Sequence, residues 1–94
     1  MPLARVVEFD GVDKQRVEEM TRDLEGGERP ADIPAKEFMM LHDPDGKKML
    51  VIFFFDNQSD YEQGDAALNA MPSGDTPGRR IAVTRYDVAA RMTA

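Results

Sequence analysis

The spacing of hydrophobic positions in this chain switches between the two-residue period of a strand and the three-to-four-residue spacing of a helix. Residues 3–11 are rich in β-branched and aromatic side chains and end at a glycine, which predicts a first strand. Within 12–27, Val17, Met20 and Leu24 recur at helical spacing while charged residues fill the other positions. The first quarter of the chain therefore predicts a strand followed by an amphipathic helix.

The rest of the chain repeats this change of period. Segments 35–42 and 47–56 predict two strands of an antiparallel hairpin, 57–71 predicts a second helix, and 79–92 predicts a long final strand that frays near Ala89. Proline- and glycine-rich segments between these elements predict loops and turns: 28–34, 43–46 and 72–78. The predicted order is β-α-β-β-α-β.

Helix ends carry their own signals. Asp13 is a plausible N-cap of the first helix, and Gly26 or Gly27 is expected to end it in a left-handed conformation. Ser59 and Glu62 have the spacing of a capping box at the start of the second helix.

Two glycines have specific expected roles. In the DPDG turn, Gly46 is expected to take the positive φ of a bulged hairpin. Gly64 is expected to let the second helix approach the sheet, with an apolar stripe formed by Tyr61, Leu68 and Met71.

This element order predicts an α+β, ferredoxin-like fold, with a four-stranded antiparallel sheet and two helices on one face. Residues 1–94 are expected to form a single domain, because 94 residues are enough for one core. A cytoplasmic location is expected, because the N-terminal residues lack the pattern of a signal peptide and the longest apolar run, 49–55, is too short to span a bilayer.

The third strand is hydrophobic on both of its sides. Met49, Val51, Phe53 and Phe55 alternate with a second apolar set, Leu50, Ile52 and Phe54. The neighbouring strand is also hydrophobic on both sides, with Met39 and Leu41 on one side and Phe38 and Met40 on the other. One set can lie beneath the helices, and a second copy of the sheet is the simplest cover for the other. The pattern therefore predicts a homodimer. The alternative is a central strand that is apolar on both sides while its neighbours are polar on the outer side.

The charge pattern limits the partners. The chain has 18 acidic and 12 basic residues and a formal net charge of −6, which argues against nucleic acid or an anionic membrane surface as a partner. Cysteine is absent, which excludes disulfides and thiolate chemistry. The last sixteen residues are nevertheless basic, with four arginines against Asp87. These arginines either balance acidic helix faces or, for one or two of them, face an anionic ligand.

Several features together resemble a known family. The element order, the length, the DPDG hairpin into an aromatic third strand and the FFFDNQSDYEQG entry to the second helix are similar to the dimeric α/β-barrel superfamily. Within it, the chain resembles small antibiotic-biosynthesis-monooxygenase-like proteins over nearly its whole length. The resemblance implies two ferredoxin-like protomers packed sheet to sheet, each with a small cavity between sheet and helices.

The resemblance also indicates which catalytic residues to look for in this chain. Members that oxygenate aromatic substrates or degrade haem tend to use an Asn on the first strand, a Trp and, for haem, a His in the second helix. Here the first strand offers Arg5, Glu8 and Asp10, the chain has no Trp, and Asn69 lies near where that His would be expected. We therefore expect no haem and no other cofactor.

Four residues are candidates for ligand binding. His42 titrates near neutrality and could act as a base beside a pocket, or it is a partly exposed neighbour of the turn. Tyr61 could orient a substrate oxygen or simply fill the core. Asn69 follows from the resemblance, and Arg85 faces solvent, pairs with a carboxylate such as Glu8, or lies in the cavity. No ligand spacing predicts a metal site.

These observations leave three functions open. The first is a homodimer that binds a hydrophobic small molecule between sheet and helices. The second is a cofactor-independent monooxygenase or isomerase acting on an aromatic or polyketide-like compound. The third is a regulatory ligand-binding module of another ferredoxin-like type.

Overall fold

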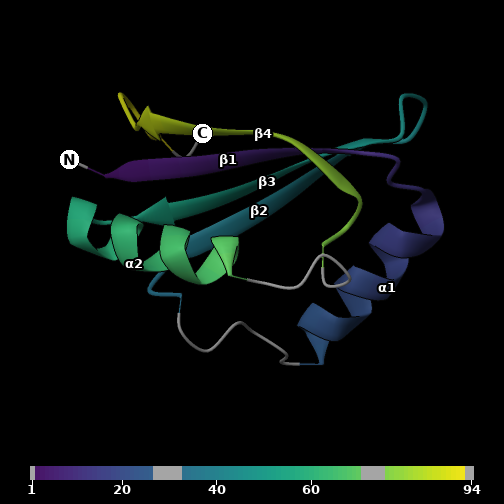
Figure 1. The fold of residues 1–94 in the computed structure, drawn as a ribbon, viewed down its shortest axis with the longest axis horizontal. Helices are drawn as coiled ribbons and strands as arrows, with labels where there is room; N and C mark the ends of the chain where they lie inside the picture. Colours follow the sequence, from purple (N-terminus) through teal and green to yellow (C-terminus); the bar gives the residue numbers. More distant parts are fainter. Residues whose placement is uncertain (1, 27–32, 71–75, 93–94) are drawn as a thin grey trace.

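The computed structural model describes residues 2–26, 33–70 and 76–92, and it contains one four-stranded sheet and two helices in this part of the chain (Figure 1). The elements follow in the order β1 (Leu3–Asp10), α1 (Lys14–Glu25), β2 (Glu37–Asp43), β3 (Lys48–Phe55), α2 (Gln58–Asn69) and β4 (Arg79–Asp87). The strands are ordered β2-β3-β1-β4, and each neighbouring pair is antiparallel. Both helices lie on the same side of the sheet (Figure 1). The predicted ferredoxin-like α+β fold is confirmed.

The helix-facing side of the sheet carries the core. Met49, Val51, Phe53 and Phe55 are all buried on this side of β3, so this alternating set is the one beneath the helices. On β1 the same side carries Leu3, Arg5, Val7 and Phe9, which are buried as well. Rings of Phe38, Phe53, Phe55 and Tyr61 follow one another with centroid distances of 5.4, 6.5 and 5.5 Å. This aromatic row joins β2, β3 and α2.

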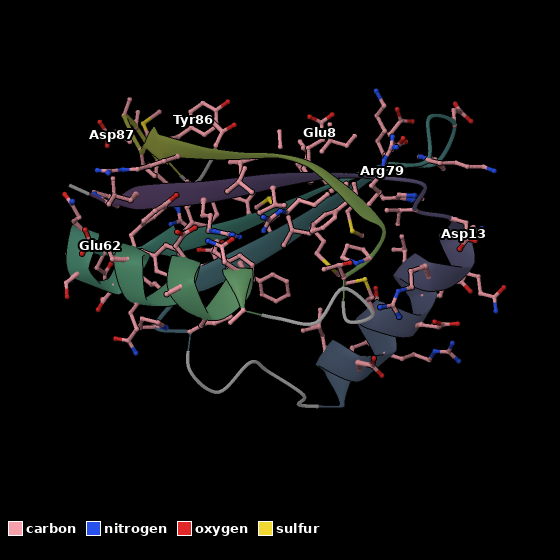
Figure 2. The ribbon with its side chains drawn as sticks, in the orientation of Figure 1. Glu8, Asp13, Glu62, Arg79, Tyr86 and Asp87 are labelled. Carbon is pink, nitrogen blue, oxygen red and sulfur yellow. The ribbon has the colours of Figure 1, made fainter. Side chains whose placement is uncertain are left out.

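The opposite side of the sheet, called the open face here, has neither of the two described helices over it (Figure 1). Directly paired residues of neighbouring strands share a side, so the register defines its rows. The first row contains Leu41, Leu50, Glu8 and Ala82; the second contains Met39, Ile52, Val6 and Thr84; the third contains Glu37, Phe54, Ala4 and Tyr86. Figure 2 shows Glu8 and Tyr86 projecting away from the helices. The open face is therefore largely apolar at its centre.

One end of the open face is covered by the chain itself. After β4, the N–H of Val88 donates to the carbonyl of Pro2 at 3.0 Å. Arg91 then lies 4.6 Å above the ring of Phe54 and forms an ion pair with Glu37. β4 ends at Asp87 and residues 88–92 are not strand, so the final strand predicted over 79–92 is shorter in the structure and ends before Ala89. The middle rows of the open face remain uncovered by these contacts.

The helix caps agree with the sequence for α1 and differ for α2. Asp13 accepts a hydrogen bond from the N–H of Arg16 at 2.9 Å, so it is the N-cap that the sequence predicts. At α2 the N-cap is Asn57, whose Oδ1 accepts from the N–H of Asp60 at 2.8 Å. The capping box predicted at Ser59 was wrong, because the helix already begins at Gln58.

The glycine expectations had mixed outcomes. Gly46 does not take a positive φ; Lys47 does, with φ 53°. Gly46 instead donates its N–H to Oδ1 of Asp43, and a Cβ there would lie 2.7 Å from that carboxylate. Gly26 caps α1 in a right-handed conformation, with φ −74°, so it does not supply the left-handed stop expected at Gly26 or Gly27. Gly27 and Met71 lie outside the described residues.

Close approach of α2 to the sheet is confirmed at Gly64. A Cβ at this position would lie 2.5 Å from Cε1 of Phe55, a side chain that is itself fully buried. Only a residue without a side chain fits between helix and ring. Gly64 and Tyr61 are the two buried residues of α2, and α1 has none. The two helices therefore cover the sheet to different degrees.

Candidate functional site

A cavity of about 820 Å³ lies between the helix-facing side of the sheet and α1. Its apolar walls come from the sheet, from both helices and from the segment before β2: Val7, Phe9, Met20, Leu24, Ile33, Ala35, Phe38, Met40, Val51, Phe53 and Leu68. The cavity follows from the unequal helix packing. Met20 and Leu24, the predicted apolar stripe of α1, line it as half-buried side chains instead of closing onto the sheet.

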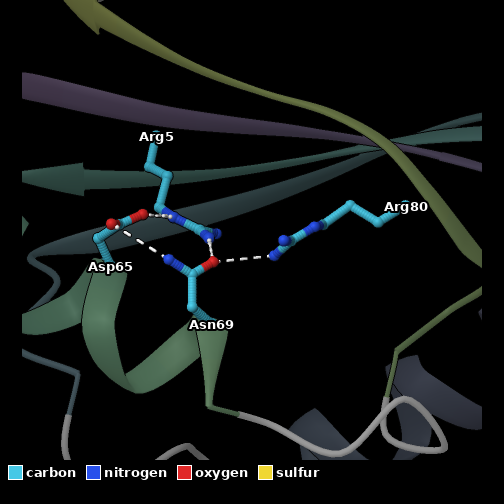
Figure 3. A network of polar contacts seen from close by, with 4 residues as sticks. All are labelled: Arg5, Asp65, Asn69 and Arg80. Carbon is cyan, nitrogen blue, oxygen red and sulfur yellow. Dashed lines mark hydrogen bonds and ion pairs between the residues drawn. The ribbon is translucent and has the colours of Figure 1, made fainter.

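A network of four polar side chains crosses from the sheet to α2 next to this cavity (Figure 3). Nε of Arg5 donates to Oδ1 of Asp65 at 2.8 Å, and Nη2 of Arg5 donates to Oδ1 of Asn69 at 3.1 Å. Nη1 of Arg80 donates to the same Oδ1 at 2.9 Å. The amide nitrogen of Asn69 completes the network with a 3.3 Å hydrogen bond to Oδ2 of Asp65. This network fixes which way the Asn69 amide points.

Arg5 is the charged centre of the network. Its side chain is 2% exposed and lies on β1 between the apolar residues Leu3 and Val7 on the helix-facing side. A buried guanidinium is tolerated only when it is paired and hydrogen bonded, and Asp65 supplies the opposite charge. Arg5 and Arg80 both line the cavity, whereas Asp65 and Asn69 stand behind them on α2.

The two arginines reach the network by different backbone routes. Arg5 follows the regular alternation of β1. In β4 the register shifts, because Glu8 pairs with Ala82 and Phe9 pairs with Arg80, which leaves Ile81 as an extra residue. A β-bulge of this kind changes the side toward which the following residues point. It places Arg80 on the helix-facing side with Phe9.

Tyr61 and Arg85 form a second polar contact, at the other end of α2. The guanidinium of Arg85 lies 5.5 Å from the centroid of the Tyr61 ring, and Arg85 is exposed. Burial raises the pKa of Tyr61, and the negative charge of Asp65 raises it further, while Arg5 and Arg85 oppose the shift. Tyr61 therefore stays protonated at neutral pH and is a hydrogen-bond donor rather than a base.

His42 lies apart from these groups, on β2. Its Nε2 is 2.9 Å from the carbonyl oxygen of Val12, an acceptor, so this nitrogen carries the proton. His42 pairs with Met49, whereas Tyr61 packs on Phe55, six residues further along β3. At 3.2–3.4 Å per residue the two ends of this strand segment are about 20 Å apart.

Of the predicted ligand-binding residues, Tyr61, Asn69 and Arg85 are thus grouped around α2, and His42 is at the β2–β3 end. None of these four lines the large cavity, although Asn69 is hydrogen bonded to both arginines that do. The sequence did not single out Arg5, Asp65 and Arg80 as a group. One signal in the sequence could have identified Arg5. The two-residue period of the first strand puts Arg5 on the same side as Val7 and Phe9, and that side is buried.

Two classes of site are not found among the residues with defined positions. No group of three or more His, Asp or Glu side chains there is arranged to hold a metal ion. In the same residues, no helix is both long enough and apolar enough to cross a membrane.

The fold and its cavity define a ferredoxin-like α+β protein with an unequal pair of helices on one face of the sheet. Among solved structures, it is similar to Rv0793 from Mycobacterium tuberculosis, with a TM-score of 0.59 and 13% sequence identity over 99% of this chain and 100% of that one. It is also similar to a putative antibiotic biosynthesis monooxygenase from Chloroflexus aurantiacus J-10-fl, with a TM-score of 0.61 and 8% identity over 99% and 98% of the two chains. No family model and no curated protein sequence matches the chain. The predicted resemblance to antibiotic-biosynthesis-monooxygenase-like proteins is confirmed at the level of the fold.

Proposed function

We propose that this protein is a homodimer that binds a hydrophobic small molecule in the cavity between α1 and the sheet. The observation that carries the proposal is the cavity itself. Its volume of about 820 Å³ lies within the range of roughly 300–1,000 Å³ typical of small-molecule sites. Its walls are mainly apolar with a smaller number of polar side chains, which is the usual composition of a ligand pocket.

The packing of α1 supports a binding role over a purely structural one. A helix with an apolar stripe normally buries that stripe against the sheet. In α1 the stripe residues Met20 and Leu24 instead face the cavity and remain half-buried. A bound apolar molecule would complete their burial, at about 25 cal/mol for each Å² of apolar surface removed from water.

The open face supports the homodimer. Met39 and Leu41 are 40% and 47% exposed on it, next to the half-buried Leu50 and Ile52 of β3. Contiguous apolar surface of this kind is usually covered by a partner, and a twofold axis brings each patch onto its own copy. A sheet-to-sheet dimer leaves the cavities on the outer sides, where ligands can enter.

An enzymatic role is the second candidate, because one structural neighbour is described as a putative antibiotic biosynthesis monooxygenase. Cofactor-independent oxygenation or isomerisation of an aromatic compound would need an acid or base in contact with the ligand. His42, Tyr61 and Arg85 do not line the cavity, and the raised pKa of Tyr61 disfavours a tyrosinate base. Binding is therefore the better-supported function, and oxygen uptake with compounds that bind would establish the enzymatic one.

The binding role is tested by titrating the protein with Nile red, a neutral apolar fluorophore, and following its emission. We expect saturable binding that Met20→Trp weakens, because the larger indole takes up part of the cavity next to α1. Gln15→Trp is the matched control, since Gln15 is exposed on the same helix and does not line the cavity. Equal binding by both variants would show that the dye does not enter the cavity and would contradict the proposal.

A further inference from the structure

The cavity combines apolar walls with several basic side chains. Of the described residues that line it, four are basic, namely Arg5, Arg16, Lys36 and Arg80, and two are acidic, Asp23 and Glu37. The chain as a whole carries a formal net charge of −6. The lining itself is therefore more basic than acidic although the chain is acidic overall, so a basic group there that lacks a carboxylate partner can attract an anionic ligand.

Most of these basic groups already have a carboxylate partner. Arg5 is paired with Asp65 at 2.8 Å, Arg16 with Glu19 at 3.4 Å, and Lys36 with Asp56 at 3.5 Å. Arg80 differs, because no carboxylate among the described residues lies within ion-pair distance of it. Its hydrogen bond goes to the neutral Oδ1 of Asn69, at 2.9 Å.

Oδ1 of Asn69 accepts hydrogen bonds from two arginines. Arg5 and Arg80 both donate to it, so two guanidinium groups converge on one uncharged acceptor (Figure 3). The four-residue network contains two positive charges and only one negative charge, that of Asp65. A guanidinium binds a planar carboxylate through two parallel hydrogen bonds more strongly than it binds an amide oxygen. A ligand carboxylate can therefore replace Asn69 as the acceptor for Arg80.

The backbone of β4 is built to present Arg80 to the cavity. Without the bulge at Ile81, regular alternation from Ala82 would put Arg80 on the open face. Its neighbour Arg79 pairs with Asp10 in the register, its Nη2 bonds Oδ2 of Asp10 at 3.1 Å, and it does not line the cavity. Adjacent arginines on one strand thus have different surroundings.

Accepting the proposed function, we infer that the ligand is an apolar carboxylic acid, bound as its carboxylate. The carboxylate pairs with Arg80, with the charge of Arg5 close to it across the Asn69 oxygen. The hydrocarbon or aryl body lies against Val51, Phe53 and Met20. Neutral molecules of the same shape lose the ion pair and bind more weakly.

Isothermal titration calorimetry with decanoate and decanamide on the full chain tests this inference, because the two probes share an apolar tail and differ in charge. We expect decanoate to bind about tenfold or more tightly than decanamide, as a charge-assisted hydrogen-bond pair implies. Arg80→Gln should remove that preference, while the matched control Arg79→Gln should keep it. Arg80 is exposed, so its replacement should not unfold the protein.

The outcomes separate the inference from the function on which it rests. Equal affinities of the wild-type protein for both probes would overturn the anionic ligand and leave the proposed binding role intact. A preference that persists in Arg80→Gln would overturn the role of Arg80. Failure of both probes to bind would overturn this inference, and the proposed function falls with it if Nile red also fails to bind.

Discussion

Nε of Arg5 and Oδ1 of Asp65 are 2.8 Å apart, and the two partners of this ion pair differ sharply in burial. Arg5 is 2% exposed, whereas Asp65 is 35% exposed. Water can therefore solvate the carboxylate if the arginine is removed, but it cannot solvate the guanidinium if the carboxylate is removed.

This asymmetry predicts unequal effects of removing the two partners. Asp65→Ala should lower the free energy of unfolding by about 1–3 kcal/mol, because it leaves a buried charge with only a neutral partner. The effect should fall below the roughly 3–5 kcal/mol of a fully buried pair, since Asp65 is partly solvated. Arg5→Met should cost less than Asp65→Ala, and the double variant should cost less than the sum of the two. Urea unfolding of the four proteins measures this cycle, and additive effects would contradict it.

The close contact of Gly64 with Phe55 predicts a second stability effect. Gly64→Ala adds a Cβ 2.5 Å from a ring that has no free space to move into. We expect a loss of about 1–3 kcal/mol from this overpacking, reduced by the roughly 1 kcal/mol that alanine gains over glycine in a helix. Gly26→Ala is the control, because Gly26 has helical φ and its Cβ would lie 3.4 Å from the nearest atom. Thermal unfolding that ranks Gly26→Ala as the less stable variant would refute the packing argument.

Local patterns predicted the strands well because each depends on residues next to one another. The alternation of Met49 to Phe55 defined two sets of side chains, and the structure places the first set beneath the helices. The alternation could not say which set this would be, because both are apolar. Which of the two sets is buried depends on the side of the sheet on which α1 and α2 pack.

The polar network could not be predicted in the same way. Arg5 and Asp65 are 60 positions apart in the chain, so no spacing motif links them. Arg80 reaches the cavity only because a bulge shifts the register of β4, and a period-two reading of that strand places it on the opposite side. The Arg5–Asp65 contact depends on tertiary packing, and the position of Arg80 depends on the bulge at Ile81, so neither produces a recognisable pattern in the sequence.

The start of α2 shows how a local motif was misassigned. Both Asn57 and Ser59 are good capping residues, and each is followed three positions later by an acidic residue. Asn57→Ala should cost about 1 kcal/mol, because it removes the acceptor for the Asp60 N–H. Ser59→Ala, inside the first turn, should change stability by less than about 0.5 kcal/mol. Chemical denaturation of the two variants distinguishes the caps, and a larger effect at Ser59 would favour the capping box.

The raised pKa of Tyr61 predicts a loss of stability at alkaline pH. Burial favours the neutral phenol, so the folded protein holds this proton more tightly than the unfolded chain does. The contribution is fully present below the unfolded pKa of about 10, and it declines as the pH rises from there toward the folded pKa. Tyr61→Phe has no proton to lose. The stability difference between wild type and Tyr61→Phe, followed by urea unfolding from neutral to alkaline pH, should therefore shift in favour of the variant above about pH 10. A constant difference would mean that the phenol titrates equally in both states.

The two sides of β3 predict opposite consequences for the same substitution at neighbouring positions. Phe53 is buried beneath the helices, so Phe53→Glu should unfold the protein, because an unpaired carboxylate cannot be solvated there. Ile52 lies at the centre of the open face, between Met39 and Val6. Ile52→Glu should leave the fold intact, as circular dichroism would show, but should convert the proposed dimer to a monomer in sedimentation equilibrium at micromolar concentration. Each large side chain buried at the twofold interface contributes roughly 1.5–3 kcal/mol, and two charges facing each other would remove that gain and add repulsion. A wild-type protein that is monomeric under the same conditions would disprove the dimer, whereas an Ile52→Glu dimer would place its interface elsewhere.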